Sequence, residues 1–276
     1  MSTVAIFGPG LIGGSLALAL QSRRPNWNVR AWARSPQSAE SARKFFPTVS
    51  LDATEVASES HICVFCTPIG AMPQLAGQLA PVVADTATVT DVGSVKAGVV
   101  SQLEATLGRR FVGSHPMAGS EQSGISAARA NLFEGAVCIL TPTGNSAPDK
   151  VEVLRDLWEC VGCRIVEMTP QEHDERIACV SHLPHAIAAS LVNAIQLRVP
   201  DVGCIAGGGY RDTTRIAAGP APMWREILLE NRAALLAGLE DFTLTLEKMK
   251  ELIRLADSAE LELFLERARA IRQDLS

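Results

Sequence analysis

The chain has 276 residues, of which 47% are hydrophobic, and its formal net charge at pH 7 is -5. This length and composition predict a globular protein with enough core for two domains, and the lack of a basic cluster argues against nucleic acid or an anionic membrane surface as a partner. The first residues lack the basic start of a signal peptide, and no apolar run approaches the ~20 residues of a membrane span, so we expect a cytoplasmic protein that binds a small molecule.

A glycine-rich turn between a predicted strand and a predicted helix opens the chain. A short apolar run is followed by Gly8-Pro-Gly-Leu-Ile-Gly13 and then by a helical pattern. In this context the glycine spacing is typical of a dinucleotide-binding turn, in which Gly8 permits the tight turn, Gly10 the close approach of a pyrophosphate, and Gly13 the contact between helix and strand. We expect the helix N-terminus, including the amides of Leu11 and Ile12, to face the phosphates.

The predicted strand 28–33 ends without the acidic residue that an NAD-preferring fold places about 20 positions past the fingerprint. Ala33 occupies that place, and Arg34 and Ser35 follow it. A guanidinium and a hydroxyl suit a 2′-phosphate, so we expect NADP to be preferred to NAD. The alternative is that Arg34 is a solvated surface charge.

Later apolar segments predict further strands at 61–66, 88–92, 111–112, 136–140 and 164–167. Helical segments separate most of them, which predicts an α/β Rossmann domain over residues 1–168. In such sheets ligands bind beyond the carboxyl ends of the strands. Thr67 and Pro68 follow one strand and Gly93 and Ser94 follow another, so we expect all four to line one crevice with the glycine-rich turn.

His115 stands in a run of small and turn-forming residues, 113–124, which we expect to be a loop. The glycines of this run permit close backbone approaches, and Pro116 keeps His115 out of the α region. Because the run follows a predicted strand, it joins the same crevice. His115 is therefore a candidate catalytic residue; the alternative is a structural histidine that ties the loop together with a hydrogen bond.

Seven cysteines include two CxxC pairs, at 63–66 and 160–163. A separation of three along a strand puts Cys63 and Cys66 on opposite faces, and the two pairs lie further apart than the ~15 to 20 residues of a zinc ribbon. We therefore expect buried thiols in a reducing compartment, and no metal site.

From residue 169 onward the strand signals stop, and apolar-periodic segments predict an all-helical domain over residues 169–276. Thr169, with Glu172 three residues later, is a plausible cap for its first helix. Helices are expected at 170–198, 223–255 and 258–273.

A glycine-rich interruption at 207–209 separates the first two predicted helices. Arg211 and Arg215 follow it one helical turn apart, so both guanidinium groups should face the same way. This arrangement favours an anion site, in particular a carboxylate held bidentately, over two solvated charges.

Asp174, His182 and His185 lie on the first predicted helix of this domain and invite a metal interpretation. Pro184 disturbs the helix between the two histidines, and no third strong ligand stands at metal spacing. We expect a solvent-shielded polar network near the cleft instead.

The ordered set of motifs resembles the TyrA family, the prephenate and arogenate dehydrogenases of tyrosine biosynthesis. The resemblance covers nearly the whole chain and is carried by residues 8–15, 91–96, 113–119, 182–185, 207–217, 223–224 and 230–231. It implies an N-terminal Rossmann domain, a helical domain that forms most of a homodimer interface, and NAD(P)-dependent oxidative decarboxylation of a cyclohexadienyl acid.

The resemblance also implies roles for the residues that match the family's motifs. His115 would accept the proton of the ring C4 hydroxyl as hydride leaves for the nicotinamide, and Ser94 would hydrogen-bond that hydroxyl or the His115 ring. Arg215 would bind the side-chain carboxylate. Further residues would line the pocket or close its rim: Arg211, Ser120, Glu121, Ser181, His182 and His185.

Several alternatives stay open. Prephenate carries a side-chain keto group and arogenate an ammonium, which Glu121 could pair with, so a prephenate, an arogenate and a dual-specificity enzyme all fit. A β-hydroxyacid dehydrogenase would be expected to use a lysine on the first interdomain helix, where this chain has histidines. A nicotinamide-binding sensor that catalyses no reaction would not explain why His115, Ser94 and Arg215 occur together.

Overall fold

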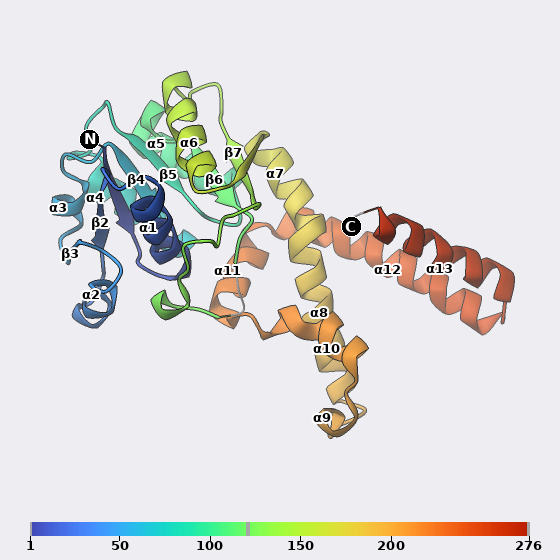
Figure 1. Ribbon diagram of the computed structural model, residues 1–276. Coiled ribbons are helices and arrows are strands. Elements are labelled where there is room, and N and C mark those ends of the chain that lie inside the picture. The colour runs from blue at the N-terminus through green and yellow to red at the C-terminus, as the bar shows by residue number, and fades with distance from the viewer. Residues whose placement is uncertain (1, 120–121, 275–276) are drawn as a thin grey trace.

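The structure is a computed structural model that describes residues 2–119 and 122–274 (Figure 1). Its first part contains a five-stranded parallel sheet in the order β3-β2-β1-β4-β5. The strands are β1 (Thr3–Phe7), β2 (Asn28–Trp32), β3 (Thr48–Ser50), β4 (Ile62–Phe65) and β5 (Thr88–Asp91). The connecting elements are α1 (Leu11–Arg23), α2 (Pro36–Ala42), α3 (Ala53–Ala57), η1 (Ile69–Ala71), α4 (Met72–Leu79) and α5 (Ala97–Leu107). This strand order has its switch point between β1 and β4, where Rossmann domains bind dinucleotides.

A three-stranded sheet continues this domain in the order β6-β7-β8. Its elements are η2 (Gly108–Arg110), β6 (Gly113–Pro116), η3 (Ile125–Ala127), β7 (Val137–Thr141), α6 (Pro148–Cys160) and β8 (Arg164–Glu167). β6 runs antiparallel to β7, and β8 runs parallel to β7. An isolated parallel bridge between Val89 and Phe111 connects β5 to the segment that leads into β6.

The sheet of the Rossmann domain is covered on both faces, and its side chains alternate between two cores. Val4 and Ile6 pack with α1 and α6, whereas Ala5 and Phe7 pack with α3, α4 and α5. Strands buried on both faces need apolar residues at every position, which explains the unbroken runs in the sequence. Cys63 lies in the second core and Cys66 packs against the first, so the prediction of opposite faces is confirmed. Burial raises the pKa of the Cys63 thiol to about 12.

The second part of the chain is helical. Its elements are α7 (Pro170–Ile177), η4 (Ala178–His182), α8 (Leu183–Gln196), α9 (Val202–Ile205), α10 (Gly208–Thr214), η5 (Arg215–Ala218), α11 (Ala221–Glu230), α12 (Arg232–Arg254) and α13 (Ser258–Gln273). The predicted cap is present, since Thr169 and Glu172 form a capping box at the start of α7. In Figure 1, α12 and α13 form a hairpin that extends away from the sheets, and α11 lies beside the Rossmann domain.

The π-helical turn η4 separates α7 from α8. Pro184 has no N–H, and its ring clashes with the carbonyl four residues earlier, which prevents a regular α-helix at this point. The predicted disturbance by Pro184 therefore takes the form of a widened turn that contains Ser181 and His182. Such turns are frequent at functional sites.

Two predictions around the histidine motif were wrong. The strand expected at 111–112 begins at Gly113 instead, and His115 lies within β6 rather than in a loop. The preference of His115 for extended backbone before Pro116 is satisfied by pairing with Ile139 on β7. That partner lies far along the chain, so local sequence did not reveal it. The short edge strand β3 was also missed.

Two predictions in the helical part were also wrong. The helix expected at 223–255 is two helices, α11 and α12, which meet at Asn231. The glycine-rich interruption at 207–209 is shorter than predicted, because Gly207 lies between α9 and α10 as the N-cap of α10, and the helix already starts at Gly208.

The continuous run Pro170–Gln196 has 27 residues and a mean hydropathy of 1.3, so by length and composition alone it could cross a membrane. This differs from the sequence expectation, because mean hydropathy averages over isolated polar residues. Four of those polar side chains are buried in this structure: His173, Asp174, His182 and His185. Helices of a folded core pass the same test, so the run is weak evidence for a membrane span.

Candidate active site

The glycine-rich turn lies between β1 and α1 at the switch point of the sheet. A Cβ on Gly13 would lie 2.5 Å from the Gly8 carbonyl oxygen and 2.9 Å from Cγ2 of Ile6, so this glycine is required for helix α1 to approach β1. A Cβ on Gly10 would meet no atom of the described residues within 4 Å. The open space beside Gly10 is therefore available to a ligand.

The surroundings of this turn fit a dinucleotide. Gly10 is the N-cap of α1 and has no side chain that could cap the first amides of the helix, which include those of Leu11 and Ile12. Thr67 follows β4 at the same edge, and its buried Oγ1 has no hydrogen-bond partner among the residues that the structure describes. Pro68 comes next and starts the turn η1. Uncapped amides and an unpaired hydroxyl suit the pyrophosphate of a cofactor.

We expect Gly10→Ala and Gly13→Ala to fail in different ways. Gly10→Ala should keep the thermal stability of the protein but weaken dinucleotide binding about tenfold or more, the scale of one hydrogen bond to a charged group. Gly13→Ala should lower the free energy of unfolding by about 1–3 kcal/mol, because its Cβ forces the backbone apart. Thermal unfolding and fluorescence titration with NAD⁺ and NADP⁺ separate the two effects. Equal losses of stability would contradict the distinction.

Arg34 and Ser35 lie just beyond β2, beside the dinucleotide edge. Arg34 is exposed and has no ion pair within the described part of the chain. Ser35 is the N-cap of α2, where its Oγ accepts a hydrogen bond from the Ser38 amide at 3.2 Å. The Ser35 hydroxyl therefore stabilises the start of α2, and the Arg34 guanidinium is the group available to bind a ligand.

Asp91 and Lys96 form a fully buried ion pair beneath the turn that holds Ser94. Asp91 Oδ2 also accepts a hydrogen bond of 2.8 Å from the Gly93 amide, and a Cβ on Gly93 would lie 2.8 Å from the same oxygen. Gly93, predicted as a cofactor contact, therefore has a structural role in closing this turn. Ser94 is half-buried, and no hydrogen bond joins it to His115 among the described residues.

His115 is 7% exposed, and its Nδ1 lies 2.8 Å from Nε2 of His173 on α7. Burial lowers the pKa of His115 well below 6.5, and the neighbouring His173 and Lys96 lower it further. The imidazole is therefore neutral at pH 7, as a general base must be.

Asp174 connects the helical domain to the Rossmann domain. Its Oδ1 lies 2.8 Å from Nδ1 of His173 and accepts a 2.7 Å hydrogen bond from the Lys96 amide, and its Oδ2 accepts one of 2.8 Å from the Ala97 amide. The carboxylate thus caps the N-terminus of α5. The side chain of Asn231, at the junction of α11 and α12, donates to the Asp174 carbonyl at 2.7 Å and holds this segment in place.

His182 and His185 are buried side by side with Trp224. The ring of His185 stacks on Trp224 with a centroid distance of 3.5 Å, and His182 meets the same indole edge-on. Nε2 of His182 and Nδ1 of His185 are buried without hydrogen-bond partners in the described residues. Burial lowers the pKa of His182 to about 4 and also lowers the pKa of His185. Both rings are therefore neutral at pH 7. The predicted burial of Asp174, His182 and His185 is confirmed, and hydrogen bonds of Asn231 link the first two.

The other predicted residues that the structure describes lie on η4, α10 and η5. Ser181 is half-buried in η4 beside His182. Arg215 begins the turn η5, whose next residue, Ile216, directs its carbonyl at His185 and raises the pKa of that ring against the effect of burial. Arg211 lies on α10 and donates from Nε to the Ala206 carbonyl at 3.2 Å. Ser120 and Glu121 lie outside the described residues.

Three residues of this region were not predicted as site residues: His173, Trp224 and Asn231. His173 lies four positions before the buried Ile177, so it occupies a core-facing position of α7. A histidine followed by an aspartate at core-facing helix positions is the signal that could have identified the pair, because buried polar groups need partners.

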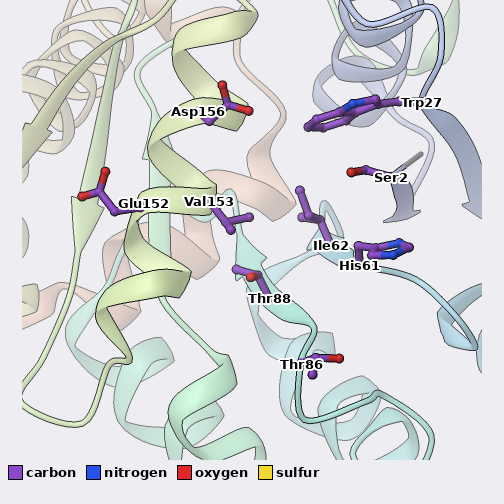
Figure 2. A pocket seen from close by; sticks show the side chains of 9 residues that line it. All are labelled: Ser2, Trp27, His61, Ile62, Thr86, Thr88, Glu152, Val153 and Asp156. Atoms are coloured by element: carbon purple, nitrogen blue, oxygen red, sulfur yellow. The ribbon is translucent and has the colours of Figure 1, made fainter.

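A separate surface cavity of about 450 Å³ lies at the opposite end of the strands (Figure 2). Its walls come from residues just before or at the starts of strands and from α6: Ser2, Trp27, His61, Ile62, Thr86, Thr88, Glu152, Val153 and Asp156. Asp156 already pairs with Arg24 at 2.7 Å. Because ligands of parallel α/β sheets bind at the carboxyl ends of the strands, the region of His115 is the better candidate active site.

Comparisons with known proteins agree with this geometry. Residues 16–167 match the family model described as prephenate dehydrogenase, nucleotide-binding domain, and residues 169–267 match prephenate dehydrogenase, dimerization domain. The chain is 34% identical to the cyclohexadienyl dehydrogenase of Zymomonas mobilis, over 92% of this chain and 89% of that protein.

Two solved structures are also similar over almost their full length. Prephenate dehydrogenase from Aquifex aeolicus, in complex with hydroxyphenyl propionate and NAD⁺, is 35% identical and has a TM-score of 0.94, covering 100% of this chain and 99% of that chain. Synechocystis arogenate dehydrogenase is 31% identical and has a TM-score of 0.85, covering 99% of this chain and 100% of that chain. The chain therefore belongs to the prephenate dehydrogenase family, whose members are oxidoreductases.

Proposed function

We propose that the chain catalyses the NAD(P)-dependent oxidative decarboxylation of prephenate to 4-hydroxyphenylpyruvate. The observation that carries the proposal is a buried, neutral His115 close to Lys96, which follows the carboxyl end of β5, the end of the sheet at which the glycine-rich turn leaves β1. Family membership supports the same reaction. A β-hydroxyacid dehydrogenase and a sensor without chemistry explain neither this histidine nor the family match.

His115 takes the proton of the ring C4 hydroxyl, which strengthens the tendency of C4 to release hydride. The oxidised cofactor, when bound, supplies the hydride acceptor. Loss of the ring carboxylate as carbon dioxide then returns an electron pair to the new carbonyl oxygen, and that oxygen recovers the proton from His115. The product ring is aromatic, which makes the overall reaction irreversible. Ser94 orients the hydroxyl, and Arg215 holds the side-chain carboxylate.

NADP is the proposed preferred cofactor, with NAD as the alternative. The support is the position of Arg34 after β2, where Ala33 replaces an acidic residue. We expect Arg34→Ala to weaken NADP⁺ binding roughly 10- to 100-fold, the scale of one charge-assisted contact, and to change NAD⁺ binding less than about twofold. Arg43→Ala is the matched control, because Arg43 is an exposed arginine at the far end of α2 and pairs with Glu40. Unchanged NADP⁺ affinity in Arg34→Ala would contradict the preference.

Prephenate is the proposed substrate, and arogenate, alone or together with prephenate, is the alternative. Relatives of similar identity carry all three names, namely prephenate, cyclohexadienyl and arogenate dehydrogenase. A steady-state assay that crosses both substrates with both cofactors tests the proposal through the rate of nicotinamide reduction. The highest kcat/KM is expected with prephenate and NADP⁺. No reduction with either substrate would refute the proposed reaction.

A homodimer formed through the helical domain is the proposed assembly. Large apolar side chains of α12 and α13 are more than half exposed in the single chain, among them Leu236, Leu244, Ile253, Leu263 and Ile271. Exposed apolar faces of this extent mark an interface, and the matching family model is a dimerization domain. Light scattering should give twice the mass of one chain.

We also propose that the boundary between the two domains lies between residues 168 and 169. The proposed location of the protein is the cytoplasm.

A further inference from the structure

Three buried side chains form a continuous chain of hydrogen bonds behind the crevice. His115 Nδ1 lies 2.8 Å from His173 Nε2, and His173 Nδ1 lies 2.8 Å from Asp174 Oδ1. His115 and Asp174 are each 7% exposed, and His173 is fully buried. These hydrogen bonds join β6 of the Rossmann domain to α7 of the helical domain.

The direction of these hydrogen bonds follows from Asp174. Burial alone would raise the pKa of this carboxyl, but the hydrogen bonds from His173 and from the amides of Ala97 and Lys96 lower the pKa below its ordinary value. Asp174 is therefore ionised and can only accept hydrogen bonds. His173 must accordingly carry a proton on Nδ1.

Neutral His173 leaves one arrangement for His115. Burial lowers the pKa of His173, and the carboxylate of Asp174 only partly offsets this effect, so the ring is neutral near pH 7. A neutral imidazole protonated on Nδ1 offers a lone pair on Nε2. His115 Nδ1 must then donate its proton to that lone pair, which leaves the lone pair of His115 on Nε2.

The other charged groups nearby do not reverse this direction. The ammonium of Lys96, which forms a fully buried ion pair with Asp91, lowers the pKa of both His115 and His173 and so favours their neutral forms. His182 contributes a neutral ring, because its Nδ1 lies 3.1 Å from the amide nitrogen of Asn231 and burial keeps its pKa low.

We propose that His173 and Asp174 are positioning residues that hold His115 as the Nδ1–H tautomer, with Nε2 as the nitrogen that accepts the substrate proton. When that proton arrives, the cation on His115 keeps its hydrogen bond to His173, and the carboxylate of Asp174 stabilises its charge through that ring. The proposal rests on the proposed function, because it assigns His115 the role of base. Asp174 also caps α5, so the same carboxylate fixes the base and the turn that holds Ser94.

Nitrogen NMR of the full chain with ¹⁵N-labelled histidine tests the tautomer directly. The protein has five histidines, so single substitutions assign their signals. At neutral pH and without ligands, the spectrum is expected to show His115 protonated on Nδ1 and unprotonated on Nε2. A His115 protonated on Nε2 would overturn the proposal. This measurement needs no turnover, so its outcome is separate from failure of the proposed reaction.

Two substitutions of His173 connect the tautomer to catalysis. His173→Gln retains an acceptor toward His115 and a donor toward Asp174, so kcat should fall less than about tenfold. His173→Leu removes both groups, so kcat should fall on the order of 10²-fold or more, with KM changed less than about threefold. The His115 signals should lose the Nδ1–H pattern in His173→Leu and keep it in His173→Gln. His61→Gln, at the other end of the sheet, is the control.

A His173→Leu variant with normal kcat would overturn the proposal. If this variant fails to fold, as judged by circular dichroism, the comparison of His173→Gln with the natural chain still decides. Loss of the Nδ1–H pattern in a folded His173→Gln protein with unchanged kcat would show that the tautomer does not matter, and would overturn the proposal as well.

Discussion

Replacing His115 by asparagine is expected to lower kcat by about 10²-fold or more, the scale of a lost general base. The asparagine amide can still donate to Nε2 of His173, so the buried chain of hydrogen bonds keeps its first member. The variant has no group that accepts a proton at neutral pH. Folding and dinucleotide binding should be unchanged, because the glycine-rich turn lies on other elements.

Steady-state kinetics with prephenate, together with dinucleotide titration, measure both parts of this prediction. His61→Asn is the matched control, since His61 is exposed and precedes β4 at the opposite end of the strands. In the natural protein, protonation of His115 should reduce kcat/KM only well below pH 6.5, because burial lowers the pKa of this ring. Near-normal kcat in His115→Asn would remove His115 from the role of base.

Much of the fold could be predicted because it depends on local patterns. The strands of the parallel sheet are buried on both faces, so they appear as short apolar runs, and the glycine-rich turn identifies the first strand and helix. β3 has three residues at the edge of the sheet and no such run, and it was missed. The register of β6 depends on Ile139, which no local pattern around His115 indicates.

The candidate site was predictable only in part, for the same reason. His115, Ser94 and Asn231 belong to recognisable motifs, but no local pattern indicates the contacts that His173 and Asn231 make with distant elements. Asn231 follows the last residue of α11, donates to the carbonyl of Asp174 and contacts His182. The chain therefore forms two helices that meet at Asn231, where periodicity predicted a single long helix. Apolar periodicity describes the helix faces but contains no information on such a hydrogen bond.

Replacing Arg215 by alanine should raise the KM for prephenate roughly 30- to 150-fold, equivalent to about 2–3 kcal/mol of lost charged hydrogen bonding, with little change in kcat. Arg215 begins η5, and the carbonyl of the next residue, Ile216, faces the buried ring of His185, so Arg215 starts the turn that lies against this ring. A planar guanidinium binds a carboxylate through two hydrogen bonds, which a lysine cannot reproduce. Arg215→Lys should therefore recover only part of the loss.

Arg211→Ala provides the matched control, because Arg211 precedes Arg215 by one helical turn and already donates to the Ala206 carbonyl. We expect its KM to change much less than that of Arg215→Ala. Equal increases in both variants would indicate a general effect of positive charge rather than a bidentate contact. An unchanged KM in Arg215→Ala would refute the assignment of the side-chain carboxylate. A fall in kcat at constant KM would instead place Arg215 at the reacting ring, since uniform binding affects KM alone.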